Sequence, residues 1–215
     1  EILTLAANTL GVLYIVEKGD TVQSMADLAG KKILAAGQGS TPEYVINYLL
    51  EKNGLTDSVQ VDYVSEHAEA VTQMAAGGAD LILVPEPFVT TALSKVEGAR
   101  VALDLTQEWA KVSDADMVMG CLVVSKAFAE ANPQALRHFM TQYAVSADYC
   151  TSHTAEAAAL IEKFGIMGSA ALAEKAIPNC NIVCVTGQEM VDMVTGMLTV
   201  LFDANPKSVG GSLPG

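Results

Sequence analysis

A glycine-rich bend between an apolar run and a helix start carries the clearest chemical signal in this chain. Residues 37–41 read Gly-Gln-Gly-Ser-Thr, and Pro42 and Glu43 follow as residues typical of a first helical turn. Such a bend leaves backbone N–H groups without intrahelical partners at the positive end of a helix. We therefore predict a cradle for an anion or a small polar molecule. The bend lacks the lysine of a phosphate-binding P-loop.

Two further bends join a strand to a helix, at residues 64–69 and 84–88. Glu66 and His67 in the first of them could act as acid and base, but adjacent side chains diverge on a helix, so ligand contact and a surface position stay open. Glu86 lies between two prolines that stiffen its backbone, which suits recognition of an amine or hydroxyl as well as a solvated loop. Bends that follow parallel strands gather at one sheet edge, so we expect all three to form one ligand wall.

Sequence motifs for catalysis or metal binding are weak. The chain has no G-x-S-x-G, no H-E-x-x-H and no carboxylate cluster with metal spacing. His138 and His153 fall in helical segments and are expected at the surface, and Trp109 is expected in the core. We therefore predict no catalytic residues, no metal and no cofactor.

The elements that must position these bends alternate between strand and helix, which predicts an α/β fold with parallel βαβ units in an open sheet. After a strand at 117–125 the chain is mostly helical, apart from a short strand at 181–185 and a turn-rich tail from Pro206. Strands are predicted at 2–7, 11–17, 32–36, 59–64, 80–84 and 99–103, with helices at 42–53, 66–76 and 87–96.

Composition limits the classes of partner. Of 215 residues, 51% are hydrophobic and the formal net charge is −13, so the chain can bury a core and would repel nucleic acid. No apolar run is long enough to cross a bilayer. The four cysteines are compatible with buried free thiols or with one disulfide, for which Cys121 and Cys180 are the candidate pair.

Several short segments, in order, resemble the extracytoplasmic solute-binding proteins of ABC importers. The nearest group is the nitrate/sulfonate/taurine-like family, which includes binders of thiamine-pyrimidine precursors. The order covers nearly the whole chain. The segments are 24–33 (Ser-Met-Ala-Asp-Leu-Ala-Gly-Lys-Lys-Ile), the bend at 37–41, 76–80 (Ala-Gly-Gly-Ala-Asp), 85–87 (Pro-Glu-Pro), 124–128 (Val-Ser-Lys-Ala-Phe) and Asn132-Pro133.

The resemblance implies a type II periplasmic-binding-protein fold of two lobes, with open, mainly parallel sheets joined by hinge crossovers. Residues 1–20 would be a lobe-one and hinge segment, 21–118 lobe two, and 119–215 the return to lobe one. The family opens with more chain than this sequence has, which predicts an incomplete lobe one with exposed apolar surface on its strands. The implied ligand-binding residues are Asn8, Thr9, Gln38, Gly39, Ser40, Thr41, Glu66, His67 and Glu86, with Met119 and Gly120 at the hinge.

The function implied by the resemblance is capture of a small polar or anionic organic solute between two closing lobes, for delivery to an ABC permease in the membrane. The location would be extracytoplasmic, periplasmic or lipoprotein-anchored, with the signal absent from this chain. Pro85 stands where sulfonate binders often carry an aromatic, which weighs against sulfonate. One alternative is an enzyme of menaquinone or thiamine-pyrimidine biosynthesis on the same fold. Another is the sensing domain of a transcription regulator, which would need a helix-turn-helix.

Overall fold

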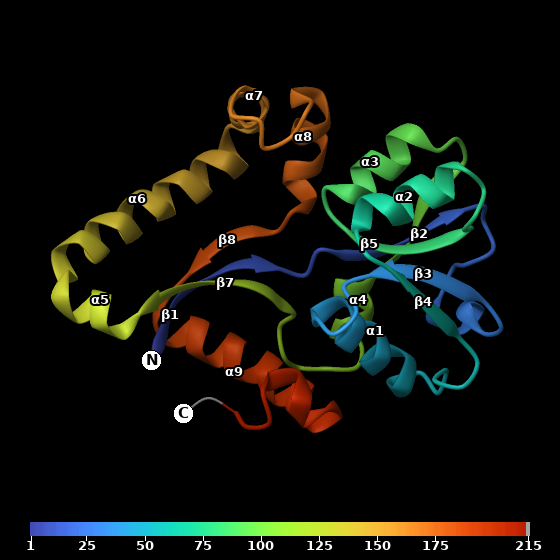
Figure 1. Ribbon diagram of the computed structural model, residues 1–215, viewed down its shortest axis with the longest axis horizontal. Helices are drawn as coiled ribbons and strands as arrows, with labels where there is room; N and C mark the ends of the chain where they lie inside the picture. The colour runs from blue at the N-terminus through green and yellow to red at the C-terminus, as the bar shows by residue number, and fades with distance from the viewer. Residues whose placement is uncertain (214–215) are drawn as a thin grey trace. The chain divides into compact units, whose positions relative to one another are not determined.

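The computed structural model describes residues 1–213, and this part of the chain forms two compact units (Figure 1). The first comprises Glu1–Gly11 and Met117–Thr195, and the second comprises Val12–Asp116 and the chain from Gly196 onward. Residues 12–20 and the tail thus group with the second unit, whereas the sequence had placed them with lobe one. These segments belong to the second unit because they pack there. The strand after Val12 lies inside the second unit's sheet, and Leu201 of the tail lines the same hollow as Tyr48.

The second unit is built on a five-stranded sheet with the order β4-β3-β5-β2-β6. β3 is parallel to both β4 and β5, whereas β2 is antiparallel to β5 and β6. Four of the strands therefore run in one direction and β2 alone opposes them, which confirms a mainly parallel sheet here. The strands are β2 (Leu13–Lys18), β3 (Lys32–Ala36), β4 (Gln60–Val64), β5 (Leu81–Pro85) and β6 (Ala99–Asp104).

Helices of the second unit form where apolar residues recur at helical spacing. In α1, Val45, Tyr48 and Leu49 are buried and recur at helical spacing. Below α2 and α3, Leu34 and Ile82 of the sheet share one hydrophobic core with the inward faces of these helices. The helical elements are the 3₁₀ turn Met25–Leu28, α1 (Thr41–Lys52), α2 (His67–Ala75), α3 (Phe88–Lys95), α4 (Leu105–Ala110) and the 3₁₀ turn Pro206–Val209.

The first unit has a three-stranded sheet with the order β7-β1-β8, in which β1 is antiparallel to both neighbours. The expectation of a mainly parallel sheet is therefore wrong for this unit. The strands are β1 (Ile2–Leu10), β7 (Val118–Ser125) and β8 (Ile182–Val185). The helical elements are α5 (Lys126–Ala131), α6 (Pro133–Ser152), α7 (Thr154–Lys163), α8 (Ala170–Ala176), the 3₁₀ turn Ile177–Asn179 and α9 (Gly187–Ala204), whose last residues belong to the second unit.

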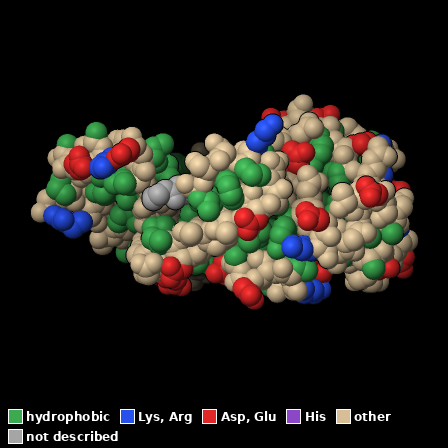
Figure 2. Space-filling model, turned by 90° about the horizontal axis from the view of Figure 1, so that it is seen from below, with side chains coloured by type: hydrophobic (Ala, Val, Ile, Leu, Met, Phe, Trp, Pro, Cys, Tyr) green, Lys and Arg blue, Asp and Glu red, His purple; other side chains and the backbone are tan. Residues whose placement is uncertain are grey.

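Apolar side chains are exposed on the strands of the first unit, as the sequence led us to expect. Ile2 is 72% exposed on β1 and Val123 is 52% exposed on β7. No residue of α6 is buried, although this helix has twenty residues. Hydrophobic side chains are also visible on the face drawn in Figure 2.

None of the four cysteines, all of which lie within residues 1–213, forms a disulfide, so the predicted Cys121–Cys180 disulfide is wrong. Cys121 lies on β7, whereas Cys180 closes the 3₁₀ turn that precedes β8. Since β1 lies between β7 and β8, the two segments are separated by about two strand spacings, roughly 10 Å, which exceeds the reach of a disulfide.

Among residues 1–213 no helix is both long and apolar enough to span a membrane.

Candidate ligand-binding site

The three predicted bends meet at one edge of the five-stranded sheet. They follow β3, β4 and β5, which are adjacent and parallel in the order β4-β3-β5. Ala36, the last residue of β3, is paired with Val64, the last residue of β4. The helices α1, α2 and α3 therefore begin side by side, which is the arrangement that the sequence predicted.

The first bend is held by hydrogen bonds within itself. The Ser40 amide and hydroxyl both donate to the Gly37 carbonyl, at 3.1 and 2.6 Å. Gly37 has a positive φ of 87°, and an added Cβ would lie 2.9 Å from the Ser40 Oγ, so a glycine is required there. Ser40 holds the N-cap position of α1 without a capping bond from its side chain. The hydroxyl therefore tightens the bend.

One of the amides expected to be free is in use. The Gly39 amide donates to Oε2 of Glu43 at 2.5 Å. The spacing from Ser40 to Glu43 is that of a capping box, but in that motif Glu43 would accept from the Ser40 amide, whereas here it accepts from the residue before it. The amides of Gln38 and Thr41 make no hydrogen bond within residues 1–213. The cradle at this bend thus offers two backbone donors.

The second bend supplies further donors at the start of α2. Glu66 occupies the N-cap position, and its side chain makes no capping bond. The Ser65 amide donates to Oε2 of Glu69 at 3.2 Å. In the described part of the chain, the amides of Glu66, His67 and Ala68 donate to no acceptor. This end of α2 carries the partial positive charge of a helix N-terminus.

His67 connects the second bend to the third. Its ring centroid lies 5.3 Å from that of Phe88, the first residue of α3. Burial lowers the pKa of His67, and the nearby Glu66 carboxylate opposes that shift only in part. The Nδ1 atom is buried and has no hydrogen-bond partner within residues 1–213. The imidazole is therefore neutral at pH 7, with one ring nitrogen unsatisfied.

Glu86 is buried and turned toward its own helix. Its two carboxylate oxygens accept from the Thr90 amide at 3.1 Å and the Thr90 hydroxyl at 3.0 Å. Burial raises the pKa of Glu86, although these two hydrogen bonds oppose the shift. The carboxylate thus supports the first turn of α3, and a direct contact with a ligand stays a prediction.

Sequence reasoning missed Tyr63, which lies beside the first two bends near the end of β4. Burial and, to a smaller extent, the charge of Glu43 raise the pKa of Tyr63 to about 12. The phenol therefore stays protonated as a hydrogen-bond donor. Its only sequence signal is an aromatic residue one position before the strand ends.

The remaining predicted residues lie on paired strands of the first unit. Thr9 on β1 is paired with Gly120 on β7, and the Thr9 hydroxyl donates to Oδ1 of Asn8 at 3.2 Å. A Cβ on Gly120 would lie 2.5 Å from that same Oδ1. Asn8, Thr9 and Gly120 are therefore brought together. Ligand contacts of Asn8 and Thr9, and the hinge role of Met119 and Gly120, stay predictions.

Comparison with known protein families shows to which family this chain belongs. The sequence profile of the family described as NMT1/THI5 like matches residues 2–157, which is more than half of the chain. The chain belongs to the NMT1/THI5-like family. No curated protein matches the chain.

Solved structures share the fold of this NMT1/THI5-like chain. An ABC transporter protein from Parabacteroides distasonis is 25% identical with a TM-score of 0.77, over 100% of this chain and 72% of that one. The periplasmic aliphatic sulphonate binding protein SsuA from Escherichia coli is 17% identical with a TM-score of 0.75, over 96% and 65%. The alkanesulfonate-binding protein SsuA from Xanthomonas axonopodis pv. citri, bound to MOPS, is 18% identical with a TM-score of 0.69, over 94% and 68%.

These neighbours confirm the resemblance read from the sequence, because they are ABC-transporter proteins, two of them described as sulfonate-binding. The NMT1/THI5-like chain spans between 65% and 72% of the length of these three structures.

The close approach at Gly120 leads to a prediction for this NMT1/THI5-like chain. Gly120→Ala is expected to lower the free energy of unfolding of the first unit by about 2 kcal/mol, because the new methyl group overpacks against Asn8. Urea unfolding followed by circular dichroism measures the change. Gly168→Ala is the matched control, since a Cβ there meets nothing within 4 Å. Equal midpoints for the two variants would contradict the packing argument.

Proposed function

We propose that this chain is the solute-binding component of an ABC importer, and that its second unit holds a small polar or anionic organic molecule at the three bends. The protein would work outside the cytoplasm and pass the solute to a membrane permease. The observation that carries the proposal is the side-by-side start of α1 and α2, with unpaired amides on both. Membership of the family and the transporter proteins among its neighbours support it.

The donors at the bends favour a ligand with a polar group of low charge. The free amides of Gln38, Thr41 and His67 can each donate one hydrogen bond. No lysine or arginine occurs at residues 37–44, 64–69 or 84–88, so helix ends and amides alone must hold any negative charge. We therefore propose a neutral polar or singly charged group at this point.

Aromatic side chains give the same site an apolar wall. Phe88 lies against His67, with ring centroids 5.3 Å apart. The unsatisfied Nδ1 of His67 adds a polar atom to this wall, and the phenol of Tyr63 lies near Glu43 of α1. The combination suits an organic body with a polar end. Two neighbours are described as sulfonate-binding proteins, and Phe88 supplies a ring three residues after Pro85.

We propose binding without catalysis at this site. The Glu86 carboxylate is occupied by Thr90, and the carboxylate that acts on His67 is that of its own neighbour Glu66. Incubation of the protein with its bound solute, followed by mass spectrometry, tests this point. Conversion of the solute that disappears in His67→Ala would establish the enzyme alternative instead.

Removing a single amide tests the bends directly. Thr41→Pro deletes one free N–H at the first helical position, where proline is well tolerated, and Ser40 already has the extended φ of −133° and ψ of −178° that precede a proline. We expect solute affinity to fall about tenfold relative to Thr41→Ala, which keeps the amide and loses only the hydroxyl. Isothermal titration with the solute that co-purifies with the protein measures both variants.

Thermal unfolding of the two Thr41 variants provides the control, since both should retain the wild-type melting temperature within a few degrees. If both variants bind the solute with equal affinity, the Thr41 amide does not contact it and the proposed orientation of the ligand is wrong.

A further inference from the structure

A cavity of about 610 Å³ lies at the edge of the five-stranded sheet opposite to the three bends. The first residues of β3 and β5, the last residue of β2 and the turn after α2 form its walls. Its volume is within the range of small-molecule sites in proteins. None of the residues at the three bends contributes to it.

Three lysines from two stretches of the second unit line this cavity: Lys18 at the end of β2, and the adjacent Lys31 and Lys32, of which Lys32 begins β3. The chain has only 12 basic residues against 25 acidic ones, so such a gathering is unusual for its composition. Lys32 forms an ion pair with Asp62. The ammonium group of Lys18 has no partner within residues 1–213.

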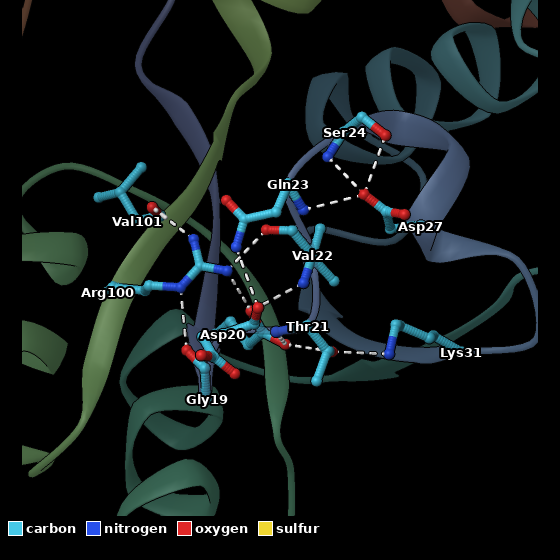
Figure 3. A network of polar contacts seen from close by, with 11 residues as sticks. Gly19, Asp20, Thr21, Val22, Gln23, Ser24, Asp27, Lys31, Arg100 and Val101 are labelled. Atoms are coloured by element: carbon cyan, nitrogen blue, oxygen red, sulfur yellow. Dashed lines mark hydrogen bonds and ion pairs between the residues drawn. The ribbon is translucent and has the colours of Figure 1, made fainter.

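Lys31 is held in place by a chain of hydrogen bonds, which Figure 3 shows around Arg100. Its ammonium group donates to the Thr21 hydroxyl at 2.8 Å, and that hydroxyl donates to Oε1 of Glu17 at 2.5 Å. Arg100 in turn pairs with Oε2 of Glu17 at 2.6 Å. Glu17, at the inner end of this series of hydrogen bonds, is 3% exposed and is therefore fixed in position. The ammonium group of Lys31 keeps two N–H donors for another group.

The charges that remain in the cavity favour an anion. Arg100 balances Glu17, and Asp62 balances Lys32. Lys18 and Lys31 then face Asp80 in the cavity wall. Asp27, outside the wall, also acts on Lys31 through its charge, but its carboxylate already accepts hydrogen bonds from the Gln23 and Ser24 amides. The last carbonyls of α2 do not offset this excess, because the amides of Ala76, Gly77 and Gly78 already bind three of them.

We propose that this cavity is a second ligand site, separate from the bends, that binds a small, multiply charged oxyanion through Lys18 and Lys31. Phosphate and polycarboxylate groups share this chemistry, since compact ammonium groups bind both as point charges. The net charge of −13 does not prevent binding, because salt at physiological strength screens distant charges beyond about 8 Å. The bends, which hold no lysine, are suited to less charged ligands.

Titration of the whole chain with inorganic phosphate and, separately, with citrate tests the site, using sodium chloride of equal ionic strength as the reference. We expect amide chemical-shift changes at residues 17–21, 31–32 and 77–81, and none at 38–41. Lys18→Gln should weaken the affinity at least about tenfold, because it removes one charge-assisted contact. Lys95→Gln, an exposed lysine at the end of α3, is the matched control and should bind like the wild type.

The Lys18 side chain makes no hydrogen bond or ion pair within residues 1–213, and Lys18→Gln keeps the backbone bond to Asp80, so this variant separates lost binding from lost structure. Binding of phosphate alone, or of citrate alone, supports the site and identifies the preferred oxyanion. The proposal is overturned if neither anion binds at millimolar concentration, if Lys18→Gln binds as well as Lys95→Gln, or if the shift changes centre on residues 38–41.

Discussion

Replacing Trp109 by alanine is expected to lower the free energy of unfolding of the second unit by about 4 kcal/mol. Trp109 is 1% exposed, and its ring lies 4.7 Å from that of Tyr48 between centroids. Its indole N–H donates to the Ala115 carbonyl at 2.6 Å. The substitution therefore creates a large cavity and leaves a carbonyl without its partner. Urea unfolding followed by circular dichroism measures the loss.

Trp109→Phe separates these two contributions. Phenylalanine keeps much of the buried ring but cannot donate to Ala115, so we expect a loss of about 2 kcal/mol, roughly half of that for alanine. If Trp109→Ala unfolds at the wild-type urea concentration, then the ring is not part of the core that supports α1 and α4.

Replacing Glu17 by glutamine is expected to cost about 3 kcal/mol at pH 7. Glu17 accepts hydrogen bonds from the Thr21 hydroxyl and amide and from the Val22 amide, and it pairs with Arg100. Glutamine would present an NH₂ group to donors and leave the Arg100 guanidinium without its counter-charge. The fluorescence of Trp109, the single tryptophan, reports unfolding of the same unit.

The effect of Glu17 depends on pH in a definite direction. Burial would raise the pKa of Glu17, but the hydrogen bonds from Thr21 and Val22 and the charge of Arg100 together lower it below its ordinary value of 4.5. A lowered pKa in the folded state contributes stability above pH 4.5, and that stability is lost as the pH falls through the folded pKa. The difference between the wild type and Glu17→Gln should therefore shrink from pH 5 toward pH 3.

The raised pKa of Glu86 affects both proteins equally, so it cancels from that difference. Glu97→Gln, an exposed acid, serves as the matched control and should follow the wild type at every pH. A difference between the wild type and Glu17→Gln that stays constant down to pH 3 would show that the charge of Glu17 is not responsible.

Much of the fold was predictable because its signals are local. The apolar spacing of Val45, Tyr48 and Leu49 is a property of α1 alone, and the alternation of strands with helices indicated the parallel order of β3, β4 and β5. The relative direction of the strands was harder to predict for the sheet of the first unit. Whether β1 runs parallel or antiparallel to β7 depends on the path of the chain between them, which periodicity does not contain.

The candidate site, too, was predictable in part from the sequence and in part only from the structure. Residue types at the bends indicated amides at helix starts, and these starts do meet. Whether each polar group is free depended on its neighbours in space: Glu43 takes the Gly39 amide, and Thr90 takes both oxygens of Glu86. The members of each pair are four positions apart in the sequence, but only the folded backbone turns one toward the other.

By itself, the sequence of this chain determined its family, its α/β class and the meeting of three bends at one edge, since periodicity and turn residues act over a few positions. Tertiary structure alone decided that the thiols stay apart, that Arg100 pairs with Glu17 across 83 positions, and that three lysines share one cavity. The physical reason is that strand order sets which distant side chains become neighbours, and hydrogen bonds and charges act only between neighbours.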